Sequence, residues 1–323
     1  MDYNDLSFTA CRLSPDERYM RRCLQLAEYG RGWVAPNPMV GAVIVYQGKI
    51  AGEAFHRKYG EAHAEVNVIG AVRNTEYLQA ATLYVNLEPC SHYGKTPPCA
   101  ELIIRKQIPR VVIGQSDPFP EVSGKGIKML KDAGIEVITG VLEKECEHLN
   151  RRFITFHQKR RPYIILKWAQ SADGFIDRFR EPGDGRLPVR FSDDFSQIRI
   201  HKMRAEEAAI MVGSRTEQLD KPQLNVRFWQ GNHPRIIKPV SHKSLALQMN
   251  ELYEQGIQSL IVEGGAKLLQ SFIEERLWDE AQVEITPLRL NEGVKVPAFP
   301  GTLENVQKCK KSSVLFFENP LKP

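Results

Sequence analysis

The pattern of apolar and polar positions divides the first half of the chain into alternating helices and strands. Ser14-Pro15-Asp16-Glu17 is a capping box with proline at the first helical position, and apolar residues then follow at helical spacing. This predicts a first helix that runs to about Tyr29 and ends at Gly30. Two β-rich runs flank Gln47-Gly48, which predicts a hairpin over 40–46 and 49–52.

The rest of the first half continues this alternation. The predicted elements are a helix over 64–72, a strand over 82–87, a helix over 99–105, a strand over 110–114, a helix over 125–133, a strand over 136–139 and a connecting helix over 142–156. Such alternation is typical of an α/β fold in which helices cover both faces of a sheet.

The second half has weaker signals. An apolar run over 163–166 predicts a buried strand, and two later strands lead into Gly213-Ser214-Arg215-Thr216 and into Glu263-Gly264-Gly265. A strand followed by glycines and a helix start can bind a phosphate or pyrophosphate. Turns in α/β proteins also use glycine for its backbone conformation alone, so both interpretations stay open.

Length and composition indicate a two-domain protein. The chain has 323 residues, and the polar stretch before Pro162 suggests domains over 1–157 and 158–323. With 42% hydrophobic and 26% charged residues, it resembles ordinary soluble proteins. The first residues lack the apolar segment of a signal peptide, and no apolar run is long enough to span a membrane. We therefore expect a cytoplasmic protein with no membrane partner.

The charge balance argues against a nucleic-acid partner. The net charge is +5, from 44 basic and 39 acidic residues, and it is spread along the chain. Nucleic-acid binders usually concentrate such charge on one surface. Lys159-Arg160-Arg161 is expected to be a solvated linker and 308–311 the end of a surface strand. Anionic small molecules remain plausible partners.

One group of residues has the spacing of a zinc site. His63-Ala64-Glu65, Pro89-Cys90 and Cys99 supply three potential ligands and one free carboxylate. An imidazole and two thiolates leave the fourth tetrahedral position open, so a bound water can lose a proton near neutral pH and attack a ring carbon. Glu65 would carry the proton, as in zinc deaminases with the H-x-E…P-C-x-x-C signature. The other four cysteines follow no disulfide spacing, which favours a reducing compartment.

The spacing between the two cysteine ligands differs from that signature. Eight residues separate Cys90 from Cys99, where the signature has two. Cys90 should therefore end a strand-to-helix turn, and the insert must fold back to deliver Cys99, with Pro97-Pro98 stiffening its return path. Two alternatives stay open: a structural zinc site with His92 as fourth ligand, and two buried free cysteines beside a surface histidine.

Motifs along the chain together resemble one family. Those of the first half are Pro36-Asn37-Pro38-Met39-Val40-Gly41, His56, Gly60, His63-Ala64-Glu65, Glu88-Pro89-Cys90-Ser91-His92, Gly94-Lys95-Thr96-Pro97-Pro98-Cys99 and Ser123-Gly124-Lys125-Gly126. Those of the second half are Lys167-Trp168-Ala169-Gln170-Ser171-Ala172-Asp173-Gly174, Arg204-Ala205, Thr216, Asp220, Pro222, Leu224, Arg227 and Glu263-Gly264-Gly265. From about Ser14 onward the chain resembles the bifunctional riboflavin-biosynthesis pyrimidine deaminase/reductases, and the long Cys-to-Cys insert is highly specific to them.

The resemblance implies a fold and two reactions. The fold would be an N-terminal cytidine-deaminase-like αβα sandwich and a C-terminal dihydrofolate-reductase-like α/β domain. The first reaction would be zinc-dependent hydrolytic deamination of 2,5-diamino-6-(5-phosphoribosylamino)pyrimidin-4(3H)-one, a phosphorylated pyrimidine. NADPH would then reduce the ribosyl group to ribityl. The resemblance also implies a homo-oligomer, with Zn²⁺ and NADPH as cofactors.

The resemblance also assigns site residues. In the deaminase, His63, Cys90 and Cys99 would bind zinc, Glu65 would be catalytic, and Asn37 and His56 would line the pyrimidine pocket. In the reductase, Arg204, Leu224, Arg227 and Glu263 would bind substrate, and Ala169, Thr216, Asp220 and Gly265 would contact the cofactor. The alternatives are a turn residue for Asn37, a structural histidine for His56 and surface ion pairs for the arginines.

Two features depart from the family pattern. Pro188-Val189-Arg190-Phe191-Ser192 stands where the family usually has Ser-x-Trp-Ile-Thr. Arg227 and Glu263 are only 36 positions apart, whereas the family normally has a longer stretch with further strands and a cofactor-contacting loop. The reductase domain should therefore be shortened, with exposed sheet edges or a different closure. An active deaminase with an impaired reductase is the resulting alternative.

Two competing hypotheses belong to other classes. A deaminase acting on nucleic acid predicts a concentrated basic surface and a short Cys-x-x-Cys, and the sequence has neither. A non-catalytic zinc scaffold predicts that Glu65→Gln leaves function unchanged.

Overall fold

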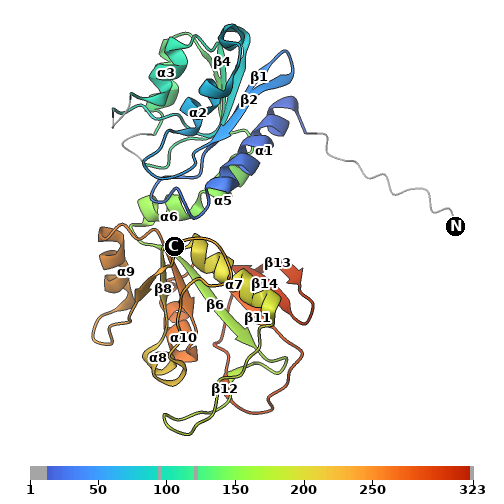
Figure 1. The fold of residues 1–323 in the computed structure, drawn as a ribbon. Coiled ribbons are helices and arrows are strands. Elements are labelled where there is room, and N and C mark those ends of the chain that lie inside the picture. The colour runs from blue at the N-terminus through green and yellow to red at the C-terminus, as the bar shows by residue number, and fades with distance from the viewer. Residues whose placement is uncertain (1–12, 94–96, 120–122, 321–323) are drawn as a thin grey trace, which may run out of the picture. The chain divides into compact units, whose positions relative to one another are not determined.

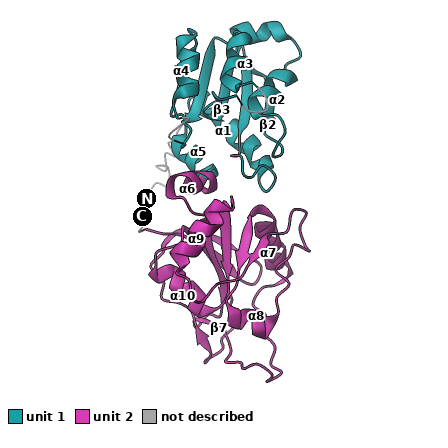
Figure 2. Ribbon diagram, turned by 90° about the vertical axis from the view of Figure 1, so that its left-hand side faces the viewer, with its two compact units in different colours: residues 1–150 teal, residues 151–323 magenta. Residues whose placement is uncertain are grey.

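The computed structural model describes residues 13–93, 97–119 and 123–320. They belong to two compact units, residues 1–150 and 151–323 (Figure 2). Helix α6 (Arg151–Lys159) is part of the second unit, whereas the sequence placed the domain boundary inside this helix, between 157 and 158. Cys11 and the insert residues Gly94, Lys95 and Thr96 lie outside the described residues.

Unit 1 is an αβα sandwich around a five-stranded sheet of order β2-β1-β3-β4-β5 (Figure 1). Strands β3, β4 and β5 are parallel, and β1 is antiparallel to both of its neighbours. Helices α1 and α5 cover one face and α2, α3 and α4 the other. The elements are α1 Pro15–Ala27, η1 Glu28–Gly30, β1 Gly41–Tyr46, β2 Lys49–Phe55, α2 Ala64–Ala71, η2 Thr75–Ala80, β3 Thr82–Leu87, α3 Cys99–Arg105, β4 Arg110–Gln115, α4 Lys125–Asp132, β5 Glu136–Ile138 and α5 Glu143–Leu149.

Local sequence signals produce the first elements as predicted. The Ser14 hydroxyl accepts a hydrogen bond from the Glu17 amide (3.2 Å), and the Glu17 carboxylate accepts one from the Ser14 amide (2.7 Å), which completes the capping box. Gln47 and Gly48 both have positive φ, 49° and 73°, which is the turn geometry that suits the twist of a two-residue hairpin.

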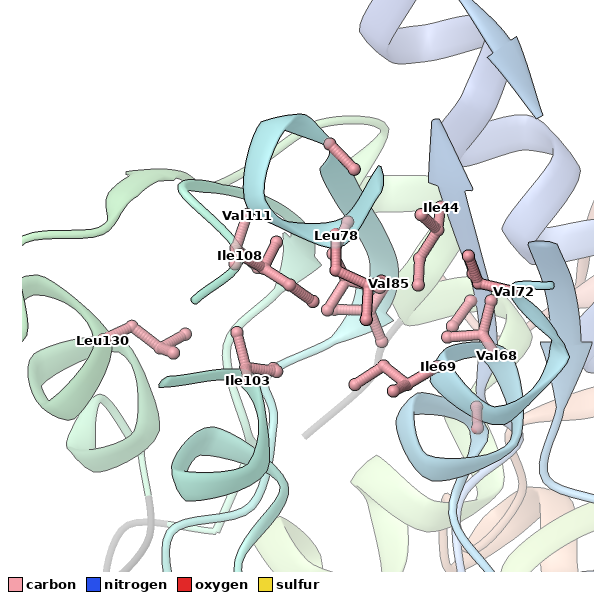
Figure 3. Packing of buried hydrophobic residues seen from close by; sticks show 14 of the residues in the cluster. Ile44, Val68, Ile69, Val72, Leu78, Val85, Ile103, Ile108, Val111 and Leu130 are labelled. Atoms are coloured by element: carbon pink, nitrogen blue, oxygen red, sulfur yellow. The ribbon is translucent and has the colours of Figure 1, made fainter. Parts of the chain in front are cut away.

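Aliphatic side chains fill the space between the sheet and helices α2, α3 and α4. Figure 3 shows Val68 of α2, Ile103 of α3 and Leu130 of α4 around Ile44 and Val85 of the sheet, and all five side chains are buried. Burying each such side chain stabilises the fold by about 1.5–3 kcal/mol. This packing holds the starts of α2 and α3, which carry the predicted zinc ligands.

The predicted helix over 142–156 is wrong as a single element. The structure has two helices, α5 and α6, which are separated by Asn150. The buried Asn150 side chain accepts a hydrogen bond from the Met39 amide (2.8 Å) and donates one to the Met39 carbonyl (3.0 Å). These contacts across 111 positions hold Asn150, and helical periodicity cannot reveal them.

Unit 2 is an α/β domain with a seven-stranded sheet of order β13-β14-β11-β6-β10-β8-β9. Strands β11, β6, β10, β8 and β9 are parallel, whereas β14 is antiparallel to both of its neighbours, β11 and β13. Helix α7 packs on one face, and α9 and α10 pack on the other. The elements after α6 are β6 Tyr163–Gln170, β7 Phe175–Asp177, α7 Asp194–Glu206, β8 Ala209–Met211, α8 Ser214–Asp220, β9 Arg235–Ile237, α9 Leu245–Glu254, β10 Ser259–Glu263, α10 Ala266–Glu274, β11 Glu280–Ile285, β12 Val294–Lys295, β13 Thr302–Lys308 and β14 Ser313–Glu318.

The shortened stretch runs directly from β9 into α9. Gln248 of α9 accepts a hydrogen bond from the Val240 amide (2.9 Å) and donates to the carbonyls of Val240 (3.2 Å) and Lys243 (3.0 Å). Among the described residues the sheet ends at the three-residue strand β9, where Ile236 is 51% exposed. This edge of the sheet is exposed, and the shortening of the reductase domain stays a prediction.

One charge cluster differs from its expected environment. Arg161, assigned to a solvated linker, is buried and pairs with Asp279 through two bonds of 2.6 and 2.9 Å. Asp279 precedes β11 and accepts the Ile164 amide as well (2.9 Å), so the pair joins two neighbouring strands. Lys310 and Lys311 lie exposed between β13 and β14, as expected.

None of the helices in the described ranges combines the length and the apolarity that crossing a membrane requires.

Candidate active sites

The three predicted zinc ligands lie together in unit 1. His63 is the N-cap of α2, Cys99 is the first residue of α3, and Cys90 follows the end of β3. The His63 Nδ1 atom is 3.6 Å from the Cys90 sulfur and 3.3 Å from the Cys99 sulfur. The Cys99 amide donates to the Cys90 sulfur at 3.3 Å, so the returning insert is fastened to the first cysteine.

These separations fit a tetrahedral zinc ion. Zn–S bonds of about 2.3 Å and Zn–N bonds of about 2.0 Å place a nitrogen and a sulfur ligand about 3.5 Å apart. No further His, Cys, Asp or Glu among the described residues joins the ligand group, and His92 is exposed outside it. The four-ligand structural site with His92 is therefore not what the described residues form, and the fourth position is open to water or substrate.

The electrostatics favour the thiolate form of Cys90, which together with burial raises the pKa of Cys99. A hydrogen bond from Cys99, together with His63, lowers the pKa of the Cys90 thiol to about 4 against the opposing effect of burial. Cys90 in turn raises the pKa of His63. A thiol that ionises this easily is prepared for a divalent cation.

Glu65 lies beside the ligand group without belonging to it. It is in the first turn of α2, 4% exposed. Burial and then the Cys90 charge raise the pKa of Glu65 to about 7, while His63 opposes the shift. A buried carboxyl group near neutral pKa can both take up and return a proton.

Asn37 and His56 form a hydrogen-bonded pair next to the zinc ligands. The Asn37 amide nitrogen lies 3.0 Å from His56 Nε2, and His56 Nδ1 lies 3.0 Å from the Ala62 carbonyl. Because a carbonyl only accepts, Nδ1 carries the proton and Nε2 accepts from Asn37. The His56 ring stands edge-on to the His63 ring at 5.6 Å, and burial lowers the pKa of His56. The structure thus brings both predicted pocket residues beside the metal group.

Glu88 organises the loop that precedes Cys90, and the sequence motif alone did not show this role. Its buried carboxylate accepts hydrogen bonds from four backbone amides, at distances of 2.9 to 3.1 Å. The donors are Asp117, Gly124, Gly126 and Ile127, at and before the start of α4. Glu88 therefore ties the end of β3 to α4.

In unit 2, the predicted substrate residues cluster near the end of β10. Arg204 of α7 makes a two-bond ion pair with Glu263 (3.1 and 2.6 Å) and donates to the Asn225 carbonyl (3.3 Å). Leu224 is buried, with a positive φ of 50°. Arg227 is exposed, and its guanidinium donates to the side chains of Gln223 (2.5 Å) and Asn225 (2.6 Å). Arg204 is therefore occupied within the protein, whereas Arg227 faces solvent.

Two of the predicted cofactor residues are in contact. Gly264 and Gly265 have φ of 75° and 74°, and a Cβ on Gly265 would lie 3.2 Å from the Thr216 hydroxyl. The two glycine turns that follow β8 and β10 thus pack together, leaving space that a side chain on either glycine would fill. Such a backbone cradle at strand ends fits a dinucleotide.

The other two predicted cofactor residues have different surroundings. Asp220, at the end of α8, pairs with the buried Arg180 at 2.6 Å. Ala169 lies in β6 opposite Glu284 of β11. In the described part of the chain, neither residue forms a hydrogen bond with Thr216 or with the glycine turn.

Lys167 is a residue that the prediction of the site missed. It lies in β6, paired with Glu263 of β10 and Gln282 of β11. Burial lowers the pKa of its ammonium, while Glu263 and Glu284 favour the charged form. The sequence did contain a signal for this residue, a lysine inside an otherwise apolar run, because buried strands of a parallel sheet seldom contain a charged side chain.

Comparison with known proteins places these sites in a family. A family model described as the cytidine and deoxycytidylate deaminase zinc-binding region matches residues 13–115, and the RibD C-terminal domain matches 162–248 and 240–318. The riboflavin biosynthesis protein RibD of Aquifex aeolicus is 38% identical, over 87% of this chain and 89% of that protein. That of Bacillus amyloliquefaciens is 36% identical, over 84% and 85%. The chain belongs to the RibD family.

A solved RibD-type structure agrees with this placement. The diaminohydroxyphosphoribosylaminopyrimidine deaminase/5-amino-6-(5-phosphoribosylamino)uracil reductase of Thermotoga maritima is 34% identical, with a TM-score of 0.84 over 94% of this chain and 98% of that one. The resemblance drawn from the sequence and the two-part fold class are confirmed. The RibD C-terminal model matches in two segments that meet at 240–248, where the short connection lies.

Proposed function

We propose that this chain carries out two consecutive steps of riboflavin biosynthesis. Unit 1 deaminates 2,5-diamino-6-(5-phosphoribosylamino)pyrimidin-4(3H)-one, and unit 2 reduces the ribosyl group of the product to ribityl with NADPH. The observation that carries the proposal is the group of His63, Cys90 and Cys99 at zinc-ligand separations, with the buried Glu65 beside it. Family membership supports both activities.

The roles in unit 1 follow from the positions of the side chains. His63, Cys90 and Cys99 would hold zinc, which would supply the Lewis acidity that lowers the pKa of a bound water to about 7. Glu65 takes the proton of the water and returns it to the ring and the leaving amine. Neutral His56 holds Asn37, whose amide carbonyl stays free to orient the pyrimidine.

In unit 2, the glycine turns would hold NADPH, which would supply the hydride for the reduction. Gly265 and Thr216 hold the cofactor, with Ala169 and Asp220 as further contacts. Arg227 binds the ribose phosphate, because a guanidinium group matches phosphate oxygens and stays charged. Arg204 forms an ion pair with Glu263 and donates to the Asn225 carbonyl, and it thereby holds the segment that carries Arg227.

The two cysteine ligands also bear on location and assembly. Cys90 and Cys99 must stay reduced to bind zinc, and we propose a cytoplasmic location on this ground. Self-association stays a prediction that a sedimentation measurement can decide.

Glu65→Gln tests the deaminase. Ammonia release from the diaminopyrimidine phosphate should fall at least about a hundredfold, while elemental analysis still finds one zinc per chain, because the amide cannot carry a proton. Glu76→Gln, an exposed acid of the same unit, is the matched control and should behave as the wild type. Continued ammonia release from Glu65→Gln, or a wild type without zinc, would overturn the deaminase proposal.

The reductase needs its own assay because the connection between β9 and α9 is short. Purified protein given the deaminated phosphoribosylamino substrate should oxidise NADPH. Ammonia release without NADPH oxidation would support the impaired-reductase alternative instead.

A further inference from the structure

Two histidines hold the backbone of the segment that carries Arg227. His201 of α7 accepts a hydrogen bond from the Arg227 amide at its Nδ1 atom (2.8 Å). His233, after the same segment, accepts one from the Val226 amide at its own Nδ1 atom (3.0 Å). Consecutive amides are therefore each received by an imidazole, and neither histidine was among the predicted site residues.

These bonds determine the proton positions on both rings. An imidazole nitrogen that accepts an N–H must have a free lone pair, so each ring carries its proton on Nε2, and a doubly protonated ring could not accept. His201 is fully buried, and its Nε2 has no hydrogen-bond partner among the described residues. Its ring stands edge-on to Phe228 at 4.7 Å.

The charges around His201 favour its neutral form. Burial lowers the pKa of His201, and Arg204 on its own helix and Arg227 on the facing segment lower it further. Glu263 of β10 acts in the opposite direction and is outweighed. The neutral ring that the hydrogen bond requires is thus the form that its surroundings stabilise.

Further contacts carry the backbone restraint to the guanidinium of Arg227. Leu224 anchors the segment in the core, and the Asn225 carbonyl is held by Arg204 (3.3 Å). Asn225 and Gln223 then receive the Arg227 guanidinium through their side-chain oxygens (2.6 and 2.5 Å). Once the backbone at 226 and 227 is held, these two side chains direct the guanidinium, and no acid among the described residues forms an ion pair with it.

We propose that His201 and His233 are positioning residues of the reductase, which hold the Val226–Arg227 backbone so that Arg227 meets the phosphate of the substrate. The inference rests on the proposed reductase function and extends it to two residues that do not touch the substrate.

Paired substitutions at each histidine test the proposal. Leucine removes the acceptor, whereas asparagine keeps an oxygen at the position of Nδ1 and cannot become charged. His201→Leu and His233→Leu should each raise KM for the deaminated phosphoribosylamino substrate roughly tenfold, with a smaller change in kcat. The reason is that the two histidines act on phosphate binding and not on the hydride-transfer step. The two asparagine variants should recover most of that loss.

The pH profile gives a readout that a merely structural role would not move. In the wild type, KM should rise as the pH falls below the ordinary histidine pKa, because His201 then becomes protonated and releases the Arg227 amide. In His201→Asn this rise should be absent. An unchanged profile in His201→Asn would contradict the role assigned to His201.

Amide hydrogen exchange in the full chain separates this inference from the proposed function. The Val226 and Arg227 amides should exchange faster in the leucine variants and near the wild-type rate in the asparagine variants, with ammonia release by unit 1 as the check on intact protein. If the wild type does not oxidise NADPH, the proposed reductase function is wrong. The exchange rates would still show whether the two histidines hold the Val226–Arg227 backbone. Leucine variants with wild-type exchange and wild-type KM would overturn the inference.

Discussion

Buried charges in unit 2 are compensated side chain by side chain. Glu280 of β11 is 7% exposed and accepts hydrogen bonds from Arg151 (3.0 Å), Tyr163 (3.1 Å) and Gln282 (2.8 Å). Burial raises the pKa of Glu280, but the Arg151 and Arg152 guanidinium groups outweigh it and hold the pKa at about 2. Removing one member of such a network leaves the others buried without their partner.

This residue should make the stability of unit 2 depend on pH. Because the pKa of Glu280 is lowered from 4.5 to about 2 by folding, its stabilisation is complete above 4.5 and is lost as the pH falls towards 2. Glu280→Gln should cost on the order of 3 kcal/mol of unfolding free energy at neutral pH and much less near pH 3. Urea unfolding followed by tryptophan fluorescence measures this, since Trp168, Trp229 and Trp278 lie in unit 2.

Two variants make that measurement specific. Trp33→Phe removes the one tryptophan of unit 1. Glu274→Gln changes an exposed acid of unit 2, the unit of Glu280, and should shift stability by less than about 0.5 kcal/mol. A cost for Glu280→Gln that stays constant from neutral to acid pH would contradict the assignment.

At the scale of elements, the zinc site depends on how closely α4 approaches the end of β3. Gly126 in the first turn of α4 has no room for a side chain, since a Cβ there would lie 2.1 Å from the Pro89 carbonyl oxygen and 3.2 Å from the Glu88 carboxylate. Pro89 directly precedes the ligand Cys90. A displacement of α4 would therefore move Pro89 and, with it, the neighbouring zinc ligand Cys90.

Gly126→Ala should weaken zinc binding. The new methyl group must push Pro89 away, so we expect roughly tenfold lower zinc affinity in chelator competition and a loss of about 2 kcal/mol in the stability of unit 1. Gly70→Ala is the matched control, because Gly70 lies in α2 with no atom within 4 Å of the added Cβ. That control should be neutral or up to about 1 kcal/mol more stable. Equal zinc affinity in both alanine variants would refute the close-approach argument.

At the scale of the whole molecule, each proposed site is built from residues of one compact unit. The zinc group and Glu65 belong to residues 1–150, and the Arg204, Arg227 and glycine-turn residues belong to 151–323. Damage to one site should therefore leave the other reaction in place, provided that each unit stays folded.

A pair of variants should separate the two reactions. Arg227→Met should raise KM for the phosphorylated reductase substrate at least about tenfold and leave ammonia release unchanged, because it removes one charged phosphate ligand. Glu65→Gln should show the reverse, with NADPH oxidation retained when the deaminated substrate is supplied. Separate assays of ammonia and of NADPH absorbance measure both, and a fall in ammonia release with Arg227→Met would contradict the separation.

Sequence reasoning was accurate where the signal is local to a short segment. The capping box at Ser14, the turn at Gln47-Gly48 and the strand over 82–87 are all as predicted, because each depends on a few neighbouring residues. The single helix over 142–156 failed, since the break at Asn150 is set by its bonds to Met39, far away in the chain.

By itself, the sequence determined the alternation of elements, the family resemblance and the zinc ligand types, because periodicity and ligand spacing are properties of the chain order. Only the tertiary structure decided that Arg204 is taken up by Glu263, that Lys167 lies between two acids, and that His201 and His233 receive successive amides. Those partners lie far apart in the sequence or depend on ring orientation, and packing alone brings donor and acceptor within bonding distance.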